Sequence, residues 1–318
     1  MNTSVVIATK NSVRTIEECL SSLMPYYEQG YISEILVVDG YSSDGTLEVI
    51  KRYPVKLLFD EGQVEASSAA YDLGWQNTRG ELVLFLDSDA YLGDGFFPKI
   101  YEFFQNDEMG MVGAEAQTVV INRLSRIIAQ WDAYHGDKIK KIQDNPSLSW
   151  FERLYRKGVW FGESQVTITG PCFIVRRNSL ETVGGFRPRQ KGRPLPWRIQ
   201  EDYLLSHRIV ERGQTATWWL GAPVYHYPRL TYSRLQKQHF RIGIGNAFTD
   251  KYYYKASRLI MTPIKYLLGA PVFGLICAFR FRNPLHLLLF PLTKYIMLAG
   301  YLYGLVIYKK QVQVMASK

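Results

Sequence analysis

A short apolar run that ends at two carboxylates constrains the fold of this chain more than any other stretch. Residues 82–86 read Leu-Val-Leu-Phe-Leu and are followed by Asp87, Ser88 and Asp89. A run of this length, with β-branched and aromatic members and a glycine before it, predicts a strand that is buried on both faces. Asp87 and Asp89 would then stand at the carboxyl end of that strand, at the rim of a sheet.

Two carboxylates this close together repel each other unless a positive charge lies between them. One interpretation is a divalent metal ion with oxygen ligands, which would share its coordination shell with substrate phosphates. The other is a turn with two solvated Asp side chains, since Asp is a common turn residue. The rest of the chain favours the first interpretation.

Strands and helices alternate through the residues that precede the pair. The pattern predicts strands at residues 4–8, 34–40, 55–59 and 82–86, and helices at 13–24, 46–51 and 66–77. Such alternation is typical of a doubly wound α/β domain with parallel strands and right-handed crossovers. Ligands bind beyond the carboxyl ends of the strands in these sheets, which is where Asp39, Asp87 and Asp89 fall.

The chain lacks the two common phosphate-binding fingerprints. No Gly-x-Gly-x-x-Gly follows the first strand, and the Gly-x-x-x-x-Gly-Lys phosphate loop is also missing from the sequence. A nucleotide bound here would therefore have to be held by carboxylates and a metal ion.

The pattern weakens after the fourth strand. We predict a helix at 96–104, a short strand at 111–114, a strand pair or one bent strand at 167–177, and helices at 178–183 and 199–213. Residues 123–160 are interpreted as helices and loops that cover the site. Glu201 and Asp202 lie near the start of the last helix, where the helix dipole favours anions, and Gly213 ends it.

Composition narrows the class of partner. The chain has 318 residues, 47% of them apolar, and a formal net charge of +9, which favours a globular protein with an anionic partner. Nucleic acid is disfavoured because the basic residues do not cluster with stacking aromatics. Cys19, Cys172 and Cys277 lie far apart, so we expect free thiols in a cytoplasmic compartment. The N-terminal residues run directly into a strand, and no secretory signal peptide is expected.

Two apolar runs near the C-terminus, at residues 259–279 and 285–308, are each long enough to cross a bilayer. They are interpreted as a hairpin of membrane helices, as kinked helices lying in the membrane interface, or as a buried helical pair of a soluble protein. Pro263, Pro271 and an inner lysine favour the interfacial arrangement. We therefore expect a catalytic domain over residues 1–235 and an amphipathic, membrane-associated helical region over 236–318.

Taken in order, these motifs resemble the inverting nucleotide-sugar glycosyltransferases of family 2. The matching segments are residues 4–11, 37–46, 80–89, 184–186 and 201–202. The resemblance implies a GT-A fold, which is a Rossmann-like α/β fold with a mainly parallel sheet flanked by helices; the C-terminal apolar helices would follow it. It also implies a nucleotide-diphosphate sugar donor and Mn²⁺ or Mg²⁺ as cofactor.

The resemblance further implies a role for each site residue. Thr9 and Asp39 would bind the nucleotide base, Asp87 and Ser88 the ribose side of the donor, Arg241 the diphosphate, and Asp89 and His226 the metal ion. Asp202 would be the general base that removes the acceptor proton, with Glu201 as its orienting neighbour. From the residues alone, His226 could equally be a packed core histidine, and Arg241 part of a basic interfacial helix.

Three positions depart from the pattern of many relatives. Tyr71 replaces an Arg that can contact the base, and Leu204 replaces the first residue of an Asp-Leu pair after the acidic dipeptide. Ile242 stands where processive members have the Trp of Gln-x-x-Arg-Trp, which argues against processive polymer synthesis.

The expected activity is metal-dependent, inverting transfer of a sugar to a hydroxyl of a lipid-linked or glycan acceptor. The expected place is the cell membrane, with the catalytic domain on its cytoplasmic side. Two alternatives stay open from the sequence. One is a polyprenyl-phosphate sugar transferase, whose acceptor is already anionic. The other is an inactive, membrane-tethered nucleotide-binding protein, which the changes at Tyr71 and Leu204 motivate.

Overall fold

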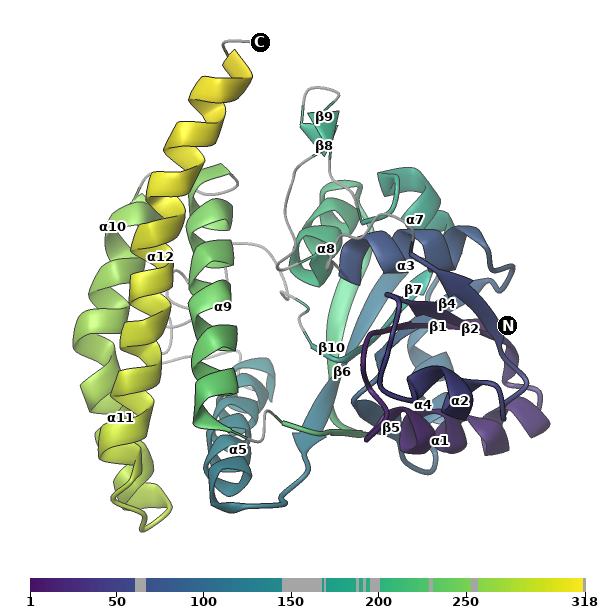
Figure 1. The fold of residues 1–318 in the computed structure, drawn as a ribbon, viewed down its shortest axis with the longest axis horizontal. Helices are drawn as coiled ribbons and strands as arrows, with labels where there is room; N and C mark the ends of the chain where they lie inside the picture. The colour runs from purple at the N-terminus through teal and green to yellow at the C-terminus, as the bar shows by residue number, and fades with distance from the viewer. Residues whose placement is uncertain are drawn as a thin grey trace. The chain divides into compact units, whose positions relative to one another are not determined.

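The computed structural model describes residues 1–60, 67–144, 168, 170–186, 189–190, 193–194, 201–228, 231–252 and 257–316. The chain divides into two compact units (Figure 1). Unit 1 comprises Met1–Val119 and Phe161–Tyr227, and unit 2 comprises Val120–Trp160 and Pro228–Lys318. The domain boundary at residue 235 stays a prediction.

Unit 1 is built on one mixed sheet of eight strands in the order β3-β2-β1-β4-β7-β6-β10-β5. The strands are β1 (Thr3–Thr9), β2 (Ile32–Asp39), β3 (Lys56–Phe59), β4 (Leu82–Asp87), β5 (Ala90–Leu92), β6 (Met109–Thr118), β7 (Cys172–Arg176) and β10 (Thr215–His226). Strands β1 to β4 pair with one another in parallel, as predicted. In the other half, β6 and β10 are parallel, whereas β7 and β5 run antiparallel to their partners. A short separate hairpin joins β8 (Arg189–Gln190) and β9 (Arg193–Pro194).

The helices of unit 1 follow the predicted order with shifted ends. They are α1 (Ile16–Glu28), α2 (Thr46–Ile50), α3 (Ser67–Gln76), α4 (Phe96–Phe103), α7 (Arg177–Val183) and α8 (Glu201–Glu211). The helix expected from residue 13 begins at Ile16 because a turn precedes it, in which the carbonyl of Ser12 accepts from the amides of Thr15 and Ile16. Part of the bent strand expected at 167–177 and the start of the helix expected from 199 lie outside the described residues.

The apolar run of β4 is buried on both faces of the sheet, as predicted. All five residues from Leu82 to Leu86 have no exposed side-chain surface. Leu82, Leu84 and Leu86 pack in the cluster that contains α1 and α4, whereas Val83 and Phe85 pack with Tyr71 and Trp75 of α3. Glu81 and Asp87 flank this run, so a slip of β4 along the sheet would carry a carboxylate into the core. This cost fixes the position of the carboxylates that follow the strand.

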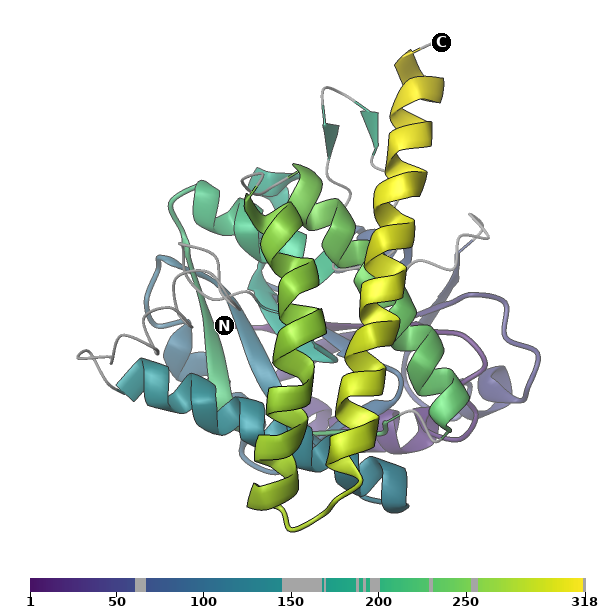
Figure 2. The same cartoon turned by 90° about the vertical axis from the view of Figure 1, so that its left-hand side faces the viewer.

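Unit 2 is helical (Figure 2). Its described helices are α5 (Arg123–Asp144), α9 (Tyr232–Tyr252), α10 (Ser257–Ile264), α11 (Ala270–Arg280) and α12 (His286–Ala316), with one π-helical turn, η2 (Lys265–Gly269), between α10 and α11. Ile127, Trp131 and Tyr134 of α5 form a core with Cys277 of α11 and Phe290 of α12. The segments Leu259–Arg280 and His286–Ile307 are long and apolar enough to cross a membrane by length and composition.

Close packing of α3 on β1 predicts a large effect of one small substitution. A β-carbon at Gly74 would lie 2.2 Å from Cγ1 of Val6, so Gly74→Ala forces the helix away from the sheet. We expect it to destabilise the protein by about 1–3 kcal/mol, measured by denaturant unfolding. Gln76→Ala, at an exposed position of the same helix, is the control and should be nearly neutral. Equal stability of the two variants would contradict this packing.

Candidate active site

Three predicted site residues stand at the ends of adjacent parallel strands. Thr9 ends β1 and pairs in register with Asp39, the last residue of β2. On the other side of β1, Ala8 pairs in register with Asp87, the last residue of β4. The sheet therefore brings together Thr9, Asp39 and Asp87, which are far apart in sequence, as the sequence analysis predicted.

Asp39 is fully buried and held by the loop that follows it. Its two carboxylate oxygens accept hydrogen bonds from the backbone amide of Ser42, at 2.7 Å, and from the Ser42 hydroxyl, at 2.5 Å. The Ser42 hydroxyl oxygen in turn accepts from the amide of Asn11. These bonds fix the carboxylate and tie the loop after β2 to the loop after β1.

Thr9 carries a polar atom without a partner. Its side chain is 6% exposed, and among the described residues its hydroxyl oxygen makes no hydrogen bond. A buried hydroxyl without a partner carries a free-energy cost, which a ligand group at this strand end would relieve.

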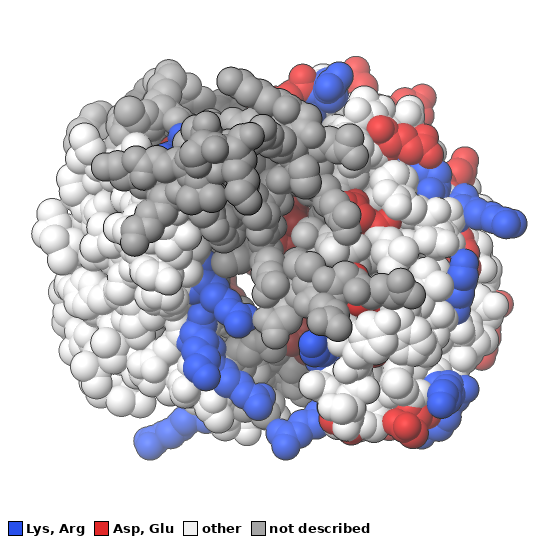
Figure 3. Space-filling view, turned by 45° about the horizontal axis from the view of Figure 1, so that its top comes forward, with Lys and Arg blue, Asp and Glu red and all other residues white. Residues whose placement is uncertain are grey.

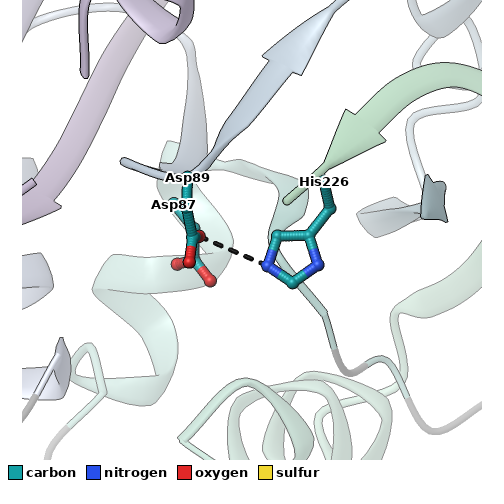
Figure 4. A group of neighbouring side chains, drawn as sticks. All are labelled: Asp87, Asp89 and His226. Atoms are coloured by element: carbon teal, nitrogen blue, oxygen red, sulfur yellow. Dashed lines mark ion pairs between the residues drawn. The ribbon is translucent and has the colours of Figure 1, made fainter. Parts of the chain in front are cut away.

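Asp87, Asp89 and His226 form the tightest group of potential ligands. One ligand atom from each of the three side chains lies within 4.8 Å of those of the other two. The imidazole Nε2 of His226 is 3.3 Å from Oδ1 of Asp89 (Figure 4). The group offers two carboxylate oxygens and one imidazole nitrogen as ligands. Mn²⁺ binds ligands of both kinds, whereas Mg²⁺ prefers the oxygens, so the ligand set fits a divalent ion.

The fold delivers His226 to this group through backbone pairing. His226 ends β10, which runs antiparallel to the short strand β5 that follows Asp89. The amide of Tyr227 donates to the carbonyl of Asp89 at 2.8 Å, which joins the two segments beside the site. His226 therefore lies at the rim of the sheet beside the acidic pair, as predicted, and its role as a ligand stays a prediction.

Tyr71 contacts Asp87 directly. Its hydroxyl donates to Oδ1 of Asp87 at 2.6 Å, and the tyrosine side chain is only 3% exposed. Burial, and next the charge of Asp89, raise the pKa of Asp87 to about 7, while the bond from Tyr71 opposes that shift. From the sequence, Tyr71 was expected only to remove an Arg that can contact the base. In the structure Tyr71 is a neutral hydrogen-bond donor to Asp87 and, unlike an Arg, adds no positive charge beside the acidic pair.

Ser88 lies in the turn between the two aspartates. Its hydroxyl is 2.9 Å from the hydroxyl of Ser12, so the turn after β4 is joined to the loop after β1. This contact positions the turn, and a direct role of Ser88 in binding the donor stays a prediction.

Asp202 is held at the start of α8. One of its carboxylate oxygens accepts from the amide of Gly170 and the other from the amide of Tyr203, each at 2.8 Å. Burial raises the pKa of Asp202 well above its usual range, and the negative charges of Glu201 and Asp87 raise it further. The mutual effect shows that Asp202 shares the electrostatic environment of the acidic pair. A carboxyl group with a raised pKa is a better proton acceptor than an ordinary Asp.

Two residues that the sequence analysis did not single out hold the Gly-Gly-Phe segment. Oδ1 of Asp72 accepts from the amide of Phe186 at 2.8 Å and from the indole of Trp75 at 2.9 Å. The guanidinium of Arg208, on α8, donates to the carbonyl of Gly185 at 2.6 Å. The only available signal for Asp72 was its place directly after Tyr71, where the chain departs from the family pattern. Arg208 gave no such signal.

The sequence model of glycosyl transferase family 2 matches residues 4–184, which is more than half of the chain. The chain belongs to glycosyl transferase family 2. Among its curated relatives is Glycosyltransferase AglE of Haloferax volcanii, which is 32% identical over 250 residues, covering 76% of this chain and 72% of AglE. The poly(ribitol-phosphate) β-N-acetylglucosaminyltransferase TarS of Staphylococcus aureus is 35% identical over 96 residues, covering 29% of this chain and 17% of TarS.

Solved structures of glycosyltransferases share the fold of this family 2 member. The mannosyltransferase PcManGT of Pyrobaculum calidifontis, solved with GDP-Man and Mn²⁺, superposes with a TM-score of 0.51 at 17% identity, covering 99% of this chain and 80% of PcManGT. Glucosyl-3-phosphoglycerate synthase of Mycobacterium tuberculosis, solved with Mn²⁺, UDP and phosphoglyceric acid, superposes with a TM-score of 0.52 at 18% identity, covering 80% of each chain. The predicted α/β GT-A fold and glycosyltransferase class are therefore confirmed, whereas the role of Arg241, on α9 in unit 2, stays a prediction.

The raised pKa of Asp87 predicts how metal binding depends on pH. Asp87 holds its proton up to a pH of about 7 in the folded protein, but only up to about 4 in the unfolded chain. Its contribution to the free energy of unfolding, measured in EDTA, should therefore fall as the pH rises from about 4 through about 7. A divalent ion offsets this loss, so Mn²⁺ should raise the melting temperature more at pH 8 than at pH 5. When free Mn²⁺ is at a hundred times its Kd, the free energy of unfolding should rise by about 2.7 kcal/mol. Asp89→Asn should abolish the effect, and an equal response at both pH values would contradict it.

The bond from Tyr71 can be tested separately. Because this bond lowers the pKa of Asp87, Tyr71→Phe should let protons compete better with the metal ion. We expect Mn²⁺ affinity at pH 7 to fall by up to about tenfold, which is one pKa unit, and to recover at higher pH. Titration calorimetry measures both. Tyr101→Phe, which removes a hydroxyl bonded to the Tyr31 carbonyl, is the control. A loss that is the same at every pH would indicate a packing defect instead.

Proposed function

We propose that this family 2 member is a metal-dependent, inverting glycosyltransferase. It would move a sugar from a nucleotide-diphosphate donor to a hydroxyl of a lipid-linked or glycan acceptor at the cytoplasmic face of the membrane. The observation that carries the proposal is the group of Asp87, Asp89 and His226 at the carboxyl ends of the strands, beside Thr9 and Asp39.

The donor would lie across the ends of β2, β1 and β4. Asp39, fixed by Ser42, and the unpartnered hydroxyl of Thr9 would take the base, and Asp87 the ribose. Asp89, Asp87 and His226 would hold Mn²⁺ or Mg²⁺, which when bound offsets the negative charge of the diphosphate. The neighbours solved with GDP-Man or UDP and Mn²⁺ support this class of donor and ion.

Asp202 would act on the acceptor. In a single displacement the acceptor oxygen forms a bond to the anomeric carbon while the bond from that carbon to the diphosphate breaks, which inverts the configuration. The acceptor proton would pass to the Asp202 carboxylate, whose raised pKa suits it as a base. Glu201, next to it at the start of α8, would help to keep that pKa high.

The relatives support a hydroxyl acceptor. TarS is named for transfer to poly(ribitol-phosphate), and a relative from Methanococcus voltae, 28% identical over 133 residues, is named for transfer to a dolichyl phosphate sugar. The two apolar segments of unit 2 and the net charge of +9 support a place at the membrane. A cytoplasmic site would be supplied with nucleotide sugars.

The direct test is release of nucleoside diphosphate from a panel of UDP-, GDP- and other nucleotide sugars, with Mn²⁺ or Mg²⁺ and with EDTA as the blank. We expect turnover of at least one donor and none in EDTA. If no donor is turned over while a donor still binds, the protein is an inactive binding protein and the proposal fails.

Asp202→Asn distinguishes the two acceptor classes. With a hydroxyl acceptor we expect a loss of about 10²–10⁴ in rate. The rise of rate with pH that deprotonation of Asp202 causes should disappear as well. Glu211→Gln, at the exposed end of the same helix, is the control and should change neither. A loss of only a few fold would point to a phosphate acceptor, which needs little help from a base.

A further inference from the structure

Unit 2 exposes an apolar surface along its C-terminal helices. Among the described residues, 17 of the 23 exposed large apolar side chains lie between residues 260 and 306. Leu268 is 66% exposed, Phe279 77% and Leu288 64%. In Figure 3 the left-hand side, where α10–α12 lie in Figure 1, is almost free of charged atoms. A soluble monomer rarely exposes an apolar surface of this extent, which we call the α10–α12 face.

The opposite side of α12 is in backbone contact with α9. A β-carbon at Gly243 of α9 would lie 2.0 Å from the carbonyl oxygen of Met297, and one at Gly300 would lie 2.0 Å from that of Phe240. Only glycine permits this approach, and α9 lies next to α12 in Figure 1. Met297 is near the middle of the apolar segment His286–Ile307, so α9 passes the centre of that segment.

The charges of α9 are incompatible with a membrane around α12. Arg234, Lys237 and Arg241 of α9 are exposed. Arg241 is two residues from Gly243, which is about 3 Å along a helix axis. If α12 crossed a bilayer, this guanidinium would lie close to the bilayer centre, where charged side chains are strongly disfavoured.

Helix α5 also argues against a bilayer around α12, because it contacts the turn between α11 and α12. His286, the first residue of α12, is fully buried between Trp131, whose indole donates to its Nδ1 at 2.9 Å, and Gln130 at 2.8 Å. The same helix exposes Arg123 and Arg126. A hairpin that crossed the membrane would carry the turn, and the polar helix bonded to it, to the far side.

The charge of the C-terminal region indicates what binds to the α10–α12 face. Residues 251–318 contain ten Lys and Arg and no Asp or Glu. Among them, Arg280 and Arg282 are exposed at the turn beside the α10–α12 face. Basic groups that border an apolar helical surface are the pattern of a protein that inserts into the interface of an anionic membrane.

We propose that the α10–α12 face inserts in the plane of one leaflet of an anionic phospholipid bilayer, and that neither apolar segment crosses it. In-plane insertion specifies how the protein would be held at the membrane. It depends on the proposed function only for the assumption that the surface contacted is a membrane. The helices would lie along the membrane, buried about 5–10 Å into the boundary of headgroups and acyl chains.

Cysteine labelling in vesicles tests the topology. The full chain with Lys99→Cys in unit 1 and Pro284→Cys at the α11–α12 turn is reconstituted in phosphatidylcholine–phosphatidylglycerol vesicles. It is then treated with a membrane-impermeant polyethylene glycol maleimide. Both positions are exposed, and the native Cys19, Cys172 and Cys277 are buried, so the parent chain supplies the background.

In-plane insertion predicts that each chain carries either two adducts or none, because both cysteines lie on one side of the bilayer. A crossing hairpin predicts one adduct on every chain and a second only after detergent, and that result would overturn the proposal. Failure of the chain to float with vesicles would overturn it too; sedimentation would then show whether a second copy covers the face. Nucleoside diphosphate release in detergent reports the proposed function independently of all three outcomes.

A matched pair of substitutions tests the face itself. Leu288→Glu places a charge on the α10–α12 face and should lower the partition into these vesicles by about tenfold or more. Ile121→Glu, at another exposed apolar position just before α5, should leave the partition within about twofold. An equal effect of the two variants would mean that the α10–α12 face is not the membrane contact.

Discussion

The candidate site in unit 1 depends on the placement of two carboxylates at the end of a fully buried strand. Burial of Leu82–Leu86 on both faces fixes β4, and the chain turns at Ser88 so that Asp87 and Asp89 lie close enough to repel each other. The pKa of Asp87, raised to about 7, is a direct consequence of that placement. His226 and the Tyr71 hydroxyl supply polar contacts to the pair.

The fold of the first hundred residues was predictable because local and tertiary preferences agree there. Buried strands of β-branched and aliphatic residues alternate with helices, and each strand end is marked by a polar turn. The parallel pairing of these strands and the placement of Asp39 and Asp87 at their carboxyl ends were therefore predictable from the sequence. The second half of the sheet was harder to predict. Pairing of β10 with β5 and β6 joins residues more than a hundred positions apart, and no local pattern specifies it.

The same distinction holds for the site. Asp39, Asp87, Asp89 and Asp202 carry motif signals, whereas the contacts that orient them do not. The bond from Tyr71 to Asp87 and the clamp of Asp72 and Arg208 on the Gly-Gly-Phe segment depend on how α3 and α8 pack in unit 1. In unit 2, length and hydropathy could not separate crossing helices from interfacial ones. The proposal of in-plane insertion rests on the backbone contact of α9 with α12, which places charged side chains beside the middle of an apolar segment.

The central claim is that Asp87, Asp89 and His226 join a metal ion to a nucleotide diphosphate. Calorimetric titration of UDP and of GDP, each with and without Mn²⁺, tests it most directly, since coupling between two ligands is reciprocal. We expect Mn²⁺ to strengthen binding of one of these nucleotides by about tenfold or more, or about 1.4 kcal/mol, and Asp89→Asn to remove the gain. Nucleotide affinity that is the same with and without Mn²⁺ would contradict it.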